Sequence, residues 1–119
     1  MAESHDTGKQ GEAIAAAYLA SKGWKILETN WHSNHEEADI IARNGDMLII
    51  VEVKTRSTSF FGSPEGFVGR QKQRRLVKTA NHYLSSNGLD LEVRFDIISI
   101  VMQLPRPKLK HIEDAFYPH

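Results

Sequence analysis

The chain has 119 residues, of which 40% are hydrophobic and 25% are charged, so we expect one globular domain over residues 1–119. It contains no cysteine, which excludes a disulfide scaffold, a thiolate zinc site and a cysteine nucleophile. The formal net charge is zero, but residues 1–59 carry six basic and nine acidic side chains, and residues 60–119 carry nine and six. This asymmetry fits either an ordinary mixed surface or a site for both a metal and a phosphate.

The chain shows no internal repeat and no targeting signal. No apolar run approaches 18 residues, and the N-terminus lacks the pattern of a signal peptide, so we expect a cytoplasmic protein without a membrane partner. Residues 1–7 are expected to be disordered, with Thr7 capping the first helix. The glycine- and proline-rich segment 57–69 is typical of a mobile loop.

Hydrophobic spacing predicts an α-β-β-β-α-β order with a possible last strand. The predicted elements are helices over 8–22 and 70–86, strands over 24–31, 38–43, 46–54 and 93–101, and a short edge strand within 109–116. This order is typical of an α/β protein with a mixed sheet and helices packed on it.

The Asn-Gly dipeptide at 44–45 predicts a tight type I′ hairpin between two strands. In the register that this loop sets, Asp39 faces Ile50 and is a diagonal neighbour of Glu52, about 7–8 Å away. Since side chains alternate along a strand, one face then collects a group of charged residues. Its members are Glu37, Asp39, Glu52 and Lys54.

Acidic groups at the end of a buried strand repel one another and lose hydration, so they need a cation. Oxygen ligands alone favour Mg²⁺ or Mn²⁺. Such an ion polarises a phosphoryl oxygen and activates water, and Lys54 is placed to hold that water or to stabilise negative charge. The alternative from the residues alone is a salt-bridged strand end, in which Lys54 pairs with Glu52 or Glu37.

Other side chains are candidates for contacts with phosphate groups. The second helix carries Arg70, Lys72, Arg74, Arg75 and Lys78, which otherwise form a solvated helix face. Thr55 and Arg56 follow the acidic strand, where they either bind a phosphate or begin a loop. Lys72 and Gln73 share the side of the apolar helix stripe and are expected to look toward the sheet.

Several stretches also match one bacterial family. They are Gly8-x-x-Gly11-Glu12-x-x-Ala15, Glu37-Ala38-Asp39-Ile40-Ile41-Ala42, Asp46-x-Leu48-Ile49-x-Val51-Glu52-Val53-Lys54-Thr55-Arg56 and Arg94-Phe95-Asp96. With them the chain resembles, over about residues 8–116, the YraN-like family (uncharacterised protein family 0102). That family is similar to archaeal Holliday-junction resolvases and belongs with the PD-(D/E)XK nucleases.

The resemblance implies a restriction-endonuclease-like fold, a central mixed β-sheet flanked by α-helices. It also implies a metal-dependent DNA endonuclease that acts on branched DNA, and symmetrical cleavage would need a homodimer. By position Asp39 and Glu52 match the metal-binding acids, and the Val53 carbonyl matches a backbone ligand. Lys54 matches the catalytic lysine. Glu12, which otherwise reads as an acid favoured by a helix N-terminus, matches a supplementary metal-binding and catalytic acid.

The resemblance also places Lys72 or Gln73 at a helix position that carries a polar residue in related nucleases. One departure is that Glu36 stands where the family usually has glycine. We assign no chemistry to Asp96 and expect a structural hydrogen bond there. Two other functions stay open: a nucleic-acid-binding module with a weak or inactive centre, and a scaffold protein that keeps only the fold.

Overall fold

The computed structural model describes residues 2–57 and 67–117, with side chains from residue 8 onward. The two helices and five strands follow the predicted order. They are α1 (Ala2–Ser21), β1 (Lys25–Ser33), β2 (Glu36–Asn44), β3 (Met47–Arg56), α2 (Arg70–Ser86), β4 (Glu92–Val101) and β5 (Lys108–Ile112). The predicted loop falls mostly on residues 58–66, which lie outside the described residues.

The strands form one mixed sheet in the order β1-β2-β3-β4-β5. Neighbouring strands are antiparallel except for β3 and β4, which are parallel and are connected through α2. The sheet confirms the predicted mixed α/β class. Strand β3 lies in its centre, and β1 and β5 form its edges.

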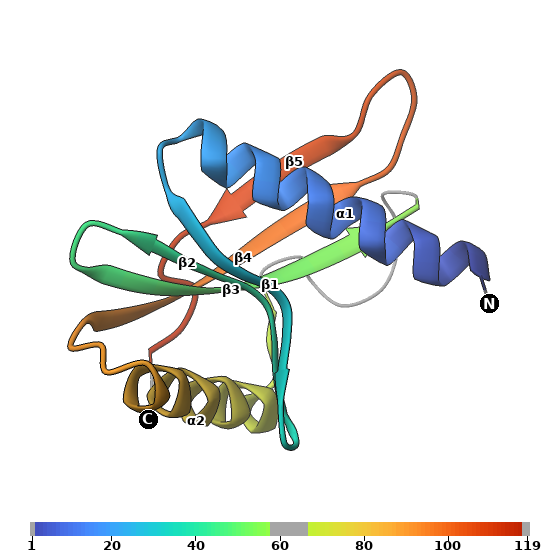
Figure 1. Cartoon of the computed structure of the whole chain (residues 1–119). Coiled ribbons are helices and arrows are strands. Elements are labelled where there is room, and N and C mark those ends of the chain that lie inside the picture. Colours follow the sequence, from blue (N-terminus) through green and yellow to red (C-terminus); the bar gives the residue numbers. More distant parts are fainter. Residues whose placement is uncertain (1, 58–66, 118–119) are drawn as a thin grey trace.

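The two helices cover opposite faces of the sheet (Figure 1). On β3, Leu48 and Ile50 belong to the core under α2, whereas Ile49 and Val51 belong to the core under α1. The central strand is therefore apolar on both sides, as expected for an interior strand. Glu52 follows directly after this buried run. Among the residues described, neither helix has the length and apolar character needed to cross a membrane.

Several element boundaries differ from the sequence prediction, most of all the start of the first helix. Helix α1 begins at Ala2 rather than at residue 8, so Thr7 lies inside the helix and does not cap it. Residues 2–7 contain no glycine or proline, and adding residues to an existing helix costs little. Strand β1 continues to Ser33, beyond the predicted end at residue 31, because residues 32 and 33 pair with β2.

The turn between β2 and β3 also differs from the prediction. Asn44 pairs with Met47, so Gly45 and Asp46 form the loop instead of Asn44 and Gly45. Gly45 has φ +62°, and Asp46 is not among the residues with positive φ. Glycine at the first loop position is typical of a type II′ turn, so the predicted type I′ turn is wrong.

This shift changes which residues pair across the hairpin, but not which face of the sheet each side chain points to. Ile50 pairs with Ile41, where the sequence predicted Asp39. Extended one step beyond the last pair, the register sets Asp39 opposite Glu52 instead of diagonal to it. Because the loop still has two residues, the side chains of the two acids remain on the same face of the sheet.

A buried polar network joins β4 to β5 on the α1 side of the sheet. The side chain of Asp96 has no exposed surface and accepts two hydrogen bonds from Arg94, each of 2.9 Å. It also accepts hydrogen bonds from His111 Nε2 at 2.8 Å and from the backbone N–H of Asp114 at 3.0 Å. The predicted structural role of Asp96 is confirmed.

Candidate active site

The candidate acids lie where β2 and β3 separate. Pairing between these strands ends at Ile40 and Val51. Beyond this point β2 stays with β1, and the tip of this hairpin lies beside α2, while β3 continues along β4 (Figure 1). Asp39 and Glu52 are the first residues past the fork. A strand fork leaves backbone groups without ladder partners, so side chains and ligands have access to them.

The side chain of Asp39 pairs with one of these backbone groups. Its Oδ2 accepts a hydrogen bond of 2.8 Å from the N–H of Val53. Burial, followed by repulsion from Glu52, raises the pKa of Asp39 to about 7, although the Val53 hydrogen bond acts in the other direction. This repulsion is consistent with the strand register, which sets Asp39 opposite Glu52.

Glu52 is 8% exposed and lies on the face of β3 that carries Leu48 and Ile50. Its Oε2 accepts a hydrogen bond from Lys72 Nζ at 2.5 Å. Burial opposes the charge on Lys72, but the hydrogen bond to Glu52 and the negative charges of Glu52, Asp39 and Glu37 together outweigh it and raise the pKa of Lys72. The cation that pairs with Glu52 is therefore Lys72 of α2. The alternative drawn from the sequence, a salt bridge with Lys54, is wrong for this carboxylate.

Lys54 makes a different contact. Its Nζ donates a hydrogen bond to the carbonyl of Phe67, just before α2, and lies 5.7 Å from the centre of the Phe67 ring. Burial lowers the pKa of Lys54, although nearby Glu52 favours its charged form. The lysine is thus near the acids and tied to the start of α2.

Glu12 reaches the fork from α1. Burial and repulsion from Glu52 raise its pKa, and a hydrogen bond with Asp39 acts in the opposite direction. Glu12 is positioned by its neighbour Gly11, which packs on Thr55 of β3. A methyl group at position 11 would collide with Thr55 Oγ1 and lie 3.0 Å from its Cβ and Cγ2.

Gly11→Ala is expected to destabilise the protein by about 1–3 kcal/mol, because the short β-branched Thr55 side chain cannot swing away. The matched control is Gly8→Ala on the same helix, where an added methyl group meets nothing within 4 Å. That change should be neutral or stabilising by up to about 1 kcal/mol, because alanine favours a helix. Urea unfolding of the two variants checks this, and equal effects would show that α1 does not rest on β3 here.

The raised pKa of Asp39 predicts a pH dependence of stability without metal. Its folded pKa of about 7 lies above the ordinary value of 3.8, so the folded protein holds a proton that the unfolded chain releases. Stability is then lost as pH rises from about 4 through about 7.

Asp39→Asn should remove this loss. In EDTA the free energy of unfolding of the unmodified protein should fall by on the order of 2–4 kcal/mol more than that of the variant between pH 5 and pH 8. Parallel pH profiles for the two proteins would contradict the placement of Asp39 beside Glu52.

The donor set at the fork fits a hard divalent cation. Two carboxylates, of Asp39 and Glu52, and the Val53 carbonyl are oxygen ligands of the kind that Mg²⁺ and Mn²⁺ prefer. Within residues 8–57 and 67–117, no three His, Asp or Glu side chains are grouped closely enough to hold a metal by themselves. Mg²⁺ is usually held by one or two carboxylates together with waters and substrate phosphates, so Asp39 and Glu52 are the side chains that would hold it.

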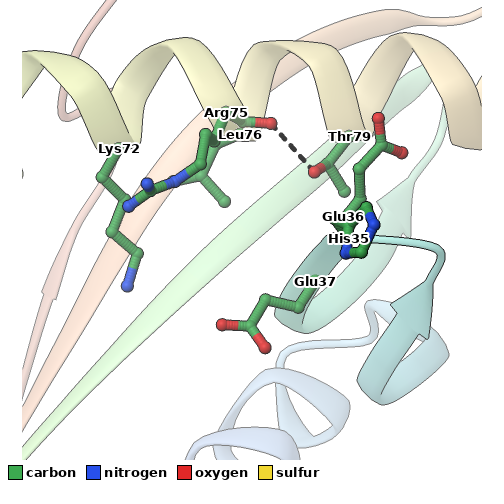
Figure 2. A pocket seen from close by; sticks show the side chains of 7 residues that line it. All are labelled: His35, Glu36, Glu37, Lys72, Arg75, Leu76 and Thr79. Atoms are coloured by element: carbon green, nitrogen blue, oxygen red, sulfur yellow. Dashed lines mark hydrogen bonds between the residues drawn. The ribbon is translucent and has the colours of Figure 1, made fainter.

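The predicted phosphate contacts divide into two groups. Lys72 lies at the acids, and Arg75 lies beside Lys72 along the same helix (Figure 2). Gln73 instead donates a hydrogen bond of 2.7 Å to the Val68 carbonyl and so fixes the start of α2. Thr55 faces α1, on the other side of the sheet.

The remaining candidates lie apart from the acids. Arg74, like Arg70 and Lys78, is exposed on α2. Arg56 ends β3, where its carbonyl accepts a hydrogen bond of 2.8 Å from Met102 N–H. The structure therefore brings Lys72 to the acids, with Arg75 beside it on α2, and leaves the other candidates away from them.

A cleft of about 420 Å³ opens beside the acids, between α2 and the β1–β2 turn (Figure 2). Its lining residues are His35, Glu36, Glu37, Lys72, Arg75, Leu76 and Thr79. Sequence reasoning missed the contributions of His35, Glu36 and Thr79. The signal for the helix side was the spacing of residues 72, 75, 76 and 79, which puts them on one helical face.

Comparison with known proteins places the chain in a family. Residues 11–100 match the sequence profile described as Uncharacterised protein family UPF0102. The chain belongs to this family. UPF0102 relatives include a protein of Flavobacterium psychrophilum, 52% identical over 98% of both chains. Two more are 49% identical over 98% of this chain: one from Christiangramia forsetii, covered over 98% of its length, and one from Parabacteroides distasonis, covered over 97%. The UPF0102 resemblance predicted from the sequence is thus confirmed.

Proposed function

We propose that this UPF0102 protein is a divalent-metal-dependent DNA endonuclease with a restriction-endonuclease-like fold. The observation that supports it most is the convergence of Asp39 and Glu52 at the strand fork, with Glu12 close by. Burial and repulsion from Glu52 raise the pKa of Asp39 to about 7, so the protein does not compensate the charge of Asp39 as Lys72 compensates that of Glu52. A pure scaffold gains nothing from such a cluster, whereas a phosphodiesterase needs it to hold a cation.

In this proposal each charged group at the fork has a separate role. Asp39 and Glu52 would hold the cation with the Val53 carbonyl, and Glu12 would supplement them from α1. A cation bound there polarises a phosphoryl oxygen and lowers the pKa of its water. Lys54 leaves the Phe67 carbonyl and orients the attacking water or stabilises charge on the phosphoryl oxygens. Lys72, which pairs with Glu52, would be free to bind a substrate phosphate if a cation took its place at that carboxylate.

Branched DNA is the proposed substrate class, from the similarity of the family to junction resolvases. Symmetrical cleavage of a junction needs two active sites, so we propose that the active form is a homodimer. Each acid cluster would then cut one strand.

A cleavage assay with labelled DNA tests the function. The purified protein is incubated with a four-way junction, a flap, a single strand and a linear duplex, in Mg²⁺, in Mn²⁺ or in EDTA. We expect cleavage of branched substrates that requires metal and is lost in Lys54→Ala. The matched control is Lys110→Ala on β5, which should cleave normally. Cleavage that persists in Lys54→Ala would come from a contaminating nuclease and would contradict the proposal.

Two contacts favour a second candidate, a nucleic-acid-binding module with an inactive centre. Lys72 already neutralises Glu52, and Lys54 is tied to Phe67. Junction binding without cleavage by the parent protein in any metal, and unchanged in Lys54→Ala, would favour this module over the nuclease.

A further inference from the structure

The cleft between α2 and the β1–β2 turn has no part in holding the proposed cation, yet it borders that site. Lys72 belongs to both, since it lines the cleft and its Nζ lies 2.5 Å from Glu52 Oε2. A group bound in the cleft would therefore be separated from Glu52 only by the side chain of Lys72. Its volume, about 420 Å³, is in the range of pockets that take small organic groups.

The helix side of the cleft is basic. Lys72 and Arg75 lie three residues apart on α2, with the buried side chain of Leu76 beneath them. Among the described residues the guanidinium of Arg75 has no hydrogen-bond or ion-pair partner. An exposed arginine without a partner is well suited to a phosphate group, which it can bind with two parallel hydrogen bonds.

The opposite side of the cleft is acidic. Glu37 is 70% exposed and lines the same cleft as Lys72 (Figure 2). One of its oxygens, Oε2, lies 3.4 Å from His32 Nδ1, and the exposed carboxylate keeps further acceptor capacity. Glu36 is more buried and accepts a hydrogen bond from His82 at 2.6 Å. Carboxylates accept hydrogen bonds from amino groups, such as the exocyclic amine of cytosine. The cleft thus offers cations on one wall and acceptors on the other.

A nucleotide carries both complementary groups, a phosphate and a base with amino donors. A base stacked within a duplex cannot enter the cleft unless it is flipped out, which costs a few kcal/mol. An unpaired base pays no such cost. A strand with unpaired nucleotides can therefore lay a phosphate on Arg75 and insert the attached base toward Glu37.

We propose that this cleft is a subsite for one unpaired, amino-bearing nucleotide of the DNA strand, next to the phosphate at Glu52. The inference rests on the proposed function and narrows its substrate to DNA with unpaired nucleotides beside the cleavage position. It assigns Arg75 to the phosphate and Glu37 to the base.

The first test is DNA binding in EDTA, where no cleavage occurs. Fluorescent DNA of one sequence is offered as a fork with an unpaired cytosine arm and as a blunt duplex, at fixed salt. Arg75→Ala should weaken fork binding about 10-fold and duplex binding by less than about twofold. The matched control Arg74→Ala removes the same charge from the same helix outside the cleft. It should weaken both DNAs alike, as a general electrostatic contact does.

The second test locates the base. An abasic residue replaces each cytosine of the unpaired arm in turn. We expect one position at which the abasic residue weakens binding about 10-fold. This penalty should disappear in Glu37→Ala and persist in Glu92→Ala, an exposed control on β4. A penalty spread evenly over the arm, or unchanged in Glu37→Ala, would overturn the subsite.

These measurements separate the subsite from the nuclease proposal. Fork-selective binding that depends on Arg75 and Glu37, without cleavage in any metal, supports the subsite and refutes the nuclease. Metal-dependent cleavage of forks and duplexes at equal rates, unaffected by Arg75→Ala, supports the nuclease and refutes the subsite. Absence of DNA binding in EDTA refutes the subsite, and absence of cleavage in every metal as well refutes the nuclease.

Discussion

Glu52→Gln is expected to lower metal-dependent DNA cleavage on the order of 1000-fold, the range seen when a group that stabilises transition-state charge is lost. Glutamine keeps the shape of the side chain, and its oxygen can still accept the hydrogen bond of Lys72. What it lacks is the negative charge that holds the cation. Rates at saturating DNA in Mg²⁺ and Mn²⁺ measure the effect.

The stability of the same variant distinguishes this role from a structural one. Removing the charge relieves the repulsion with Asp39, and the Lys72 side chain is 43% exposed, so its charge stays hydrated. The free energy of unfolding in EDTA should therefore change by less than about 1 kcal/mol. Glu92→Gln, the same exchange on β4, controls for the substitution itself. A variant that unfolds readily, or one that cleaves at the parent rate, contradicts the assignment of Glu52.

Asp96→Ala is expected to have the largest effect on stability, a loss of about 3–5 kcal/mol. The carboxylate is fully buried and joins Arg94 and His111, so its removal leaves a half-buried guanidinium and a buried imidazole without their partner. Chemical denaturation measures the loss.

The control is Asp90→Ala, because Asp90 is exposed in the loop before β4. It should change the free energy of unfolding by less than about 0.5 kcal/mol. Cleavage by the fraction of Asp96→Ala that remains folded should equal that of the parent. A stable Asp96→Ala that cannot cleave DNA would instead make Asp96 part of the active centre.

The sequence predicted the parts of the structure that depend on local patterns. The apolar run 47–51 predicted an interior strand, and the structure covers both of its faces. The predicted face of each side chain in the β2–β3 hairpin was correct, because any two-residue loop leaves these faces unchanged. Asp39 and Glu52 could therefore be placed together before the fold was known.

The predictions were wrong where two turn conformations fit the same residues, and incomplete where segments far apart in the sequence come into contact. Asn44-Gly45 and Gly45-Asp46 both make two-residue turns, and pattern alone does not choose between types I′ and II′. The contacts of Lys54 with Phe67 and of Lys72 with Glu52 depend on how α2 packs against β3. The cleft likewise forms only when the β1–β2 turn folds against α2, which no single stretch of sequence encodes.

Titration with Mn²⁺ tests the central claim, that Asp39 and Glu52 together hold a divalent cation. Calorimetry at pH 7.5 compares the parent with Asp39→Asn, Glu52→Gln and the control Glu92→Gln. We predict one site in the parent and in the control, weakened about 100-fold in each of the two fork variants, since each loses one of two charged ligands. Lys72→Met should bind Mn²⁺ more tightly, because it removes the competing cation. Equal Mn²⁺ affinity in the parent and both fork variants would contradict the account.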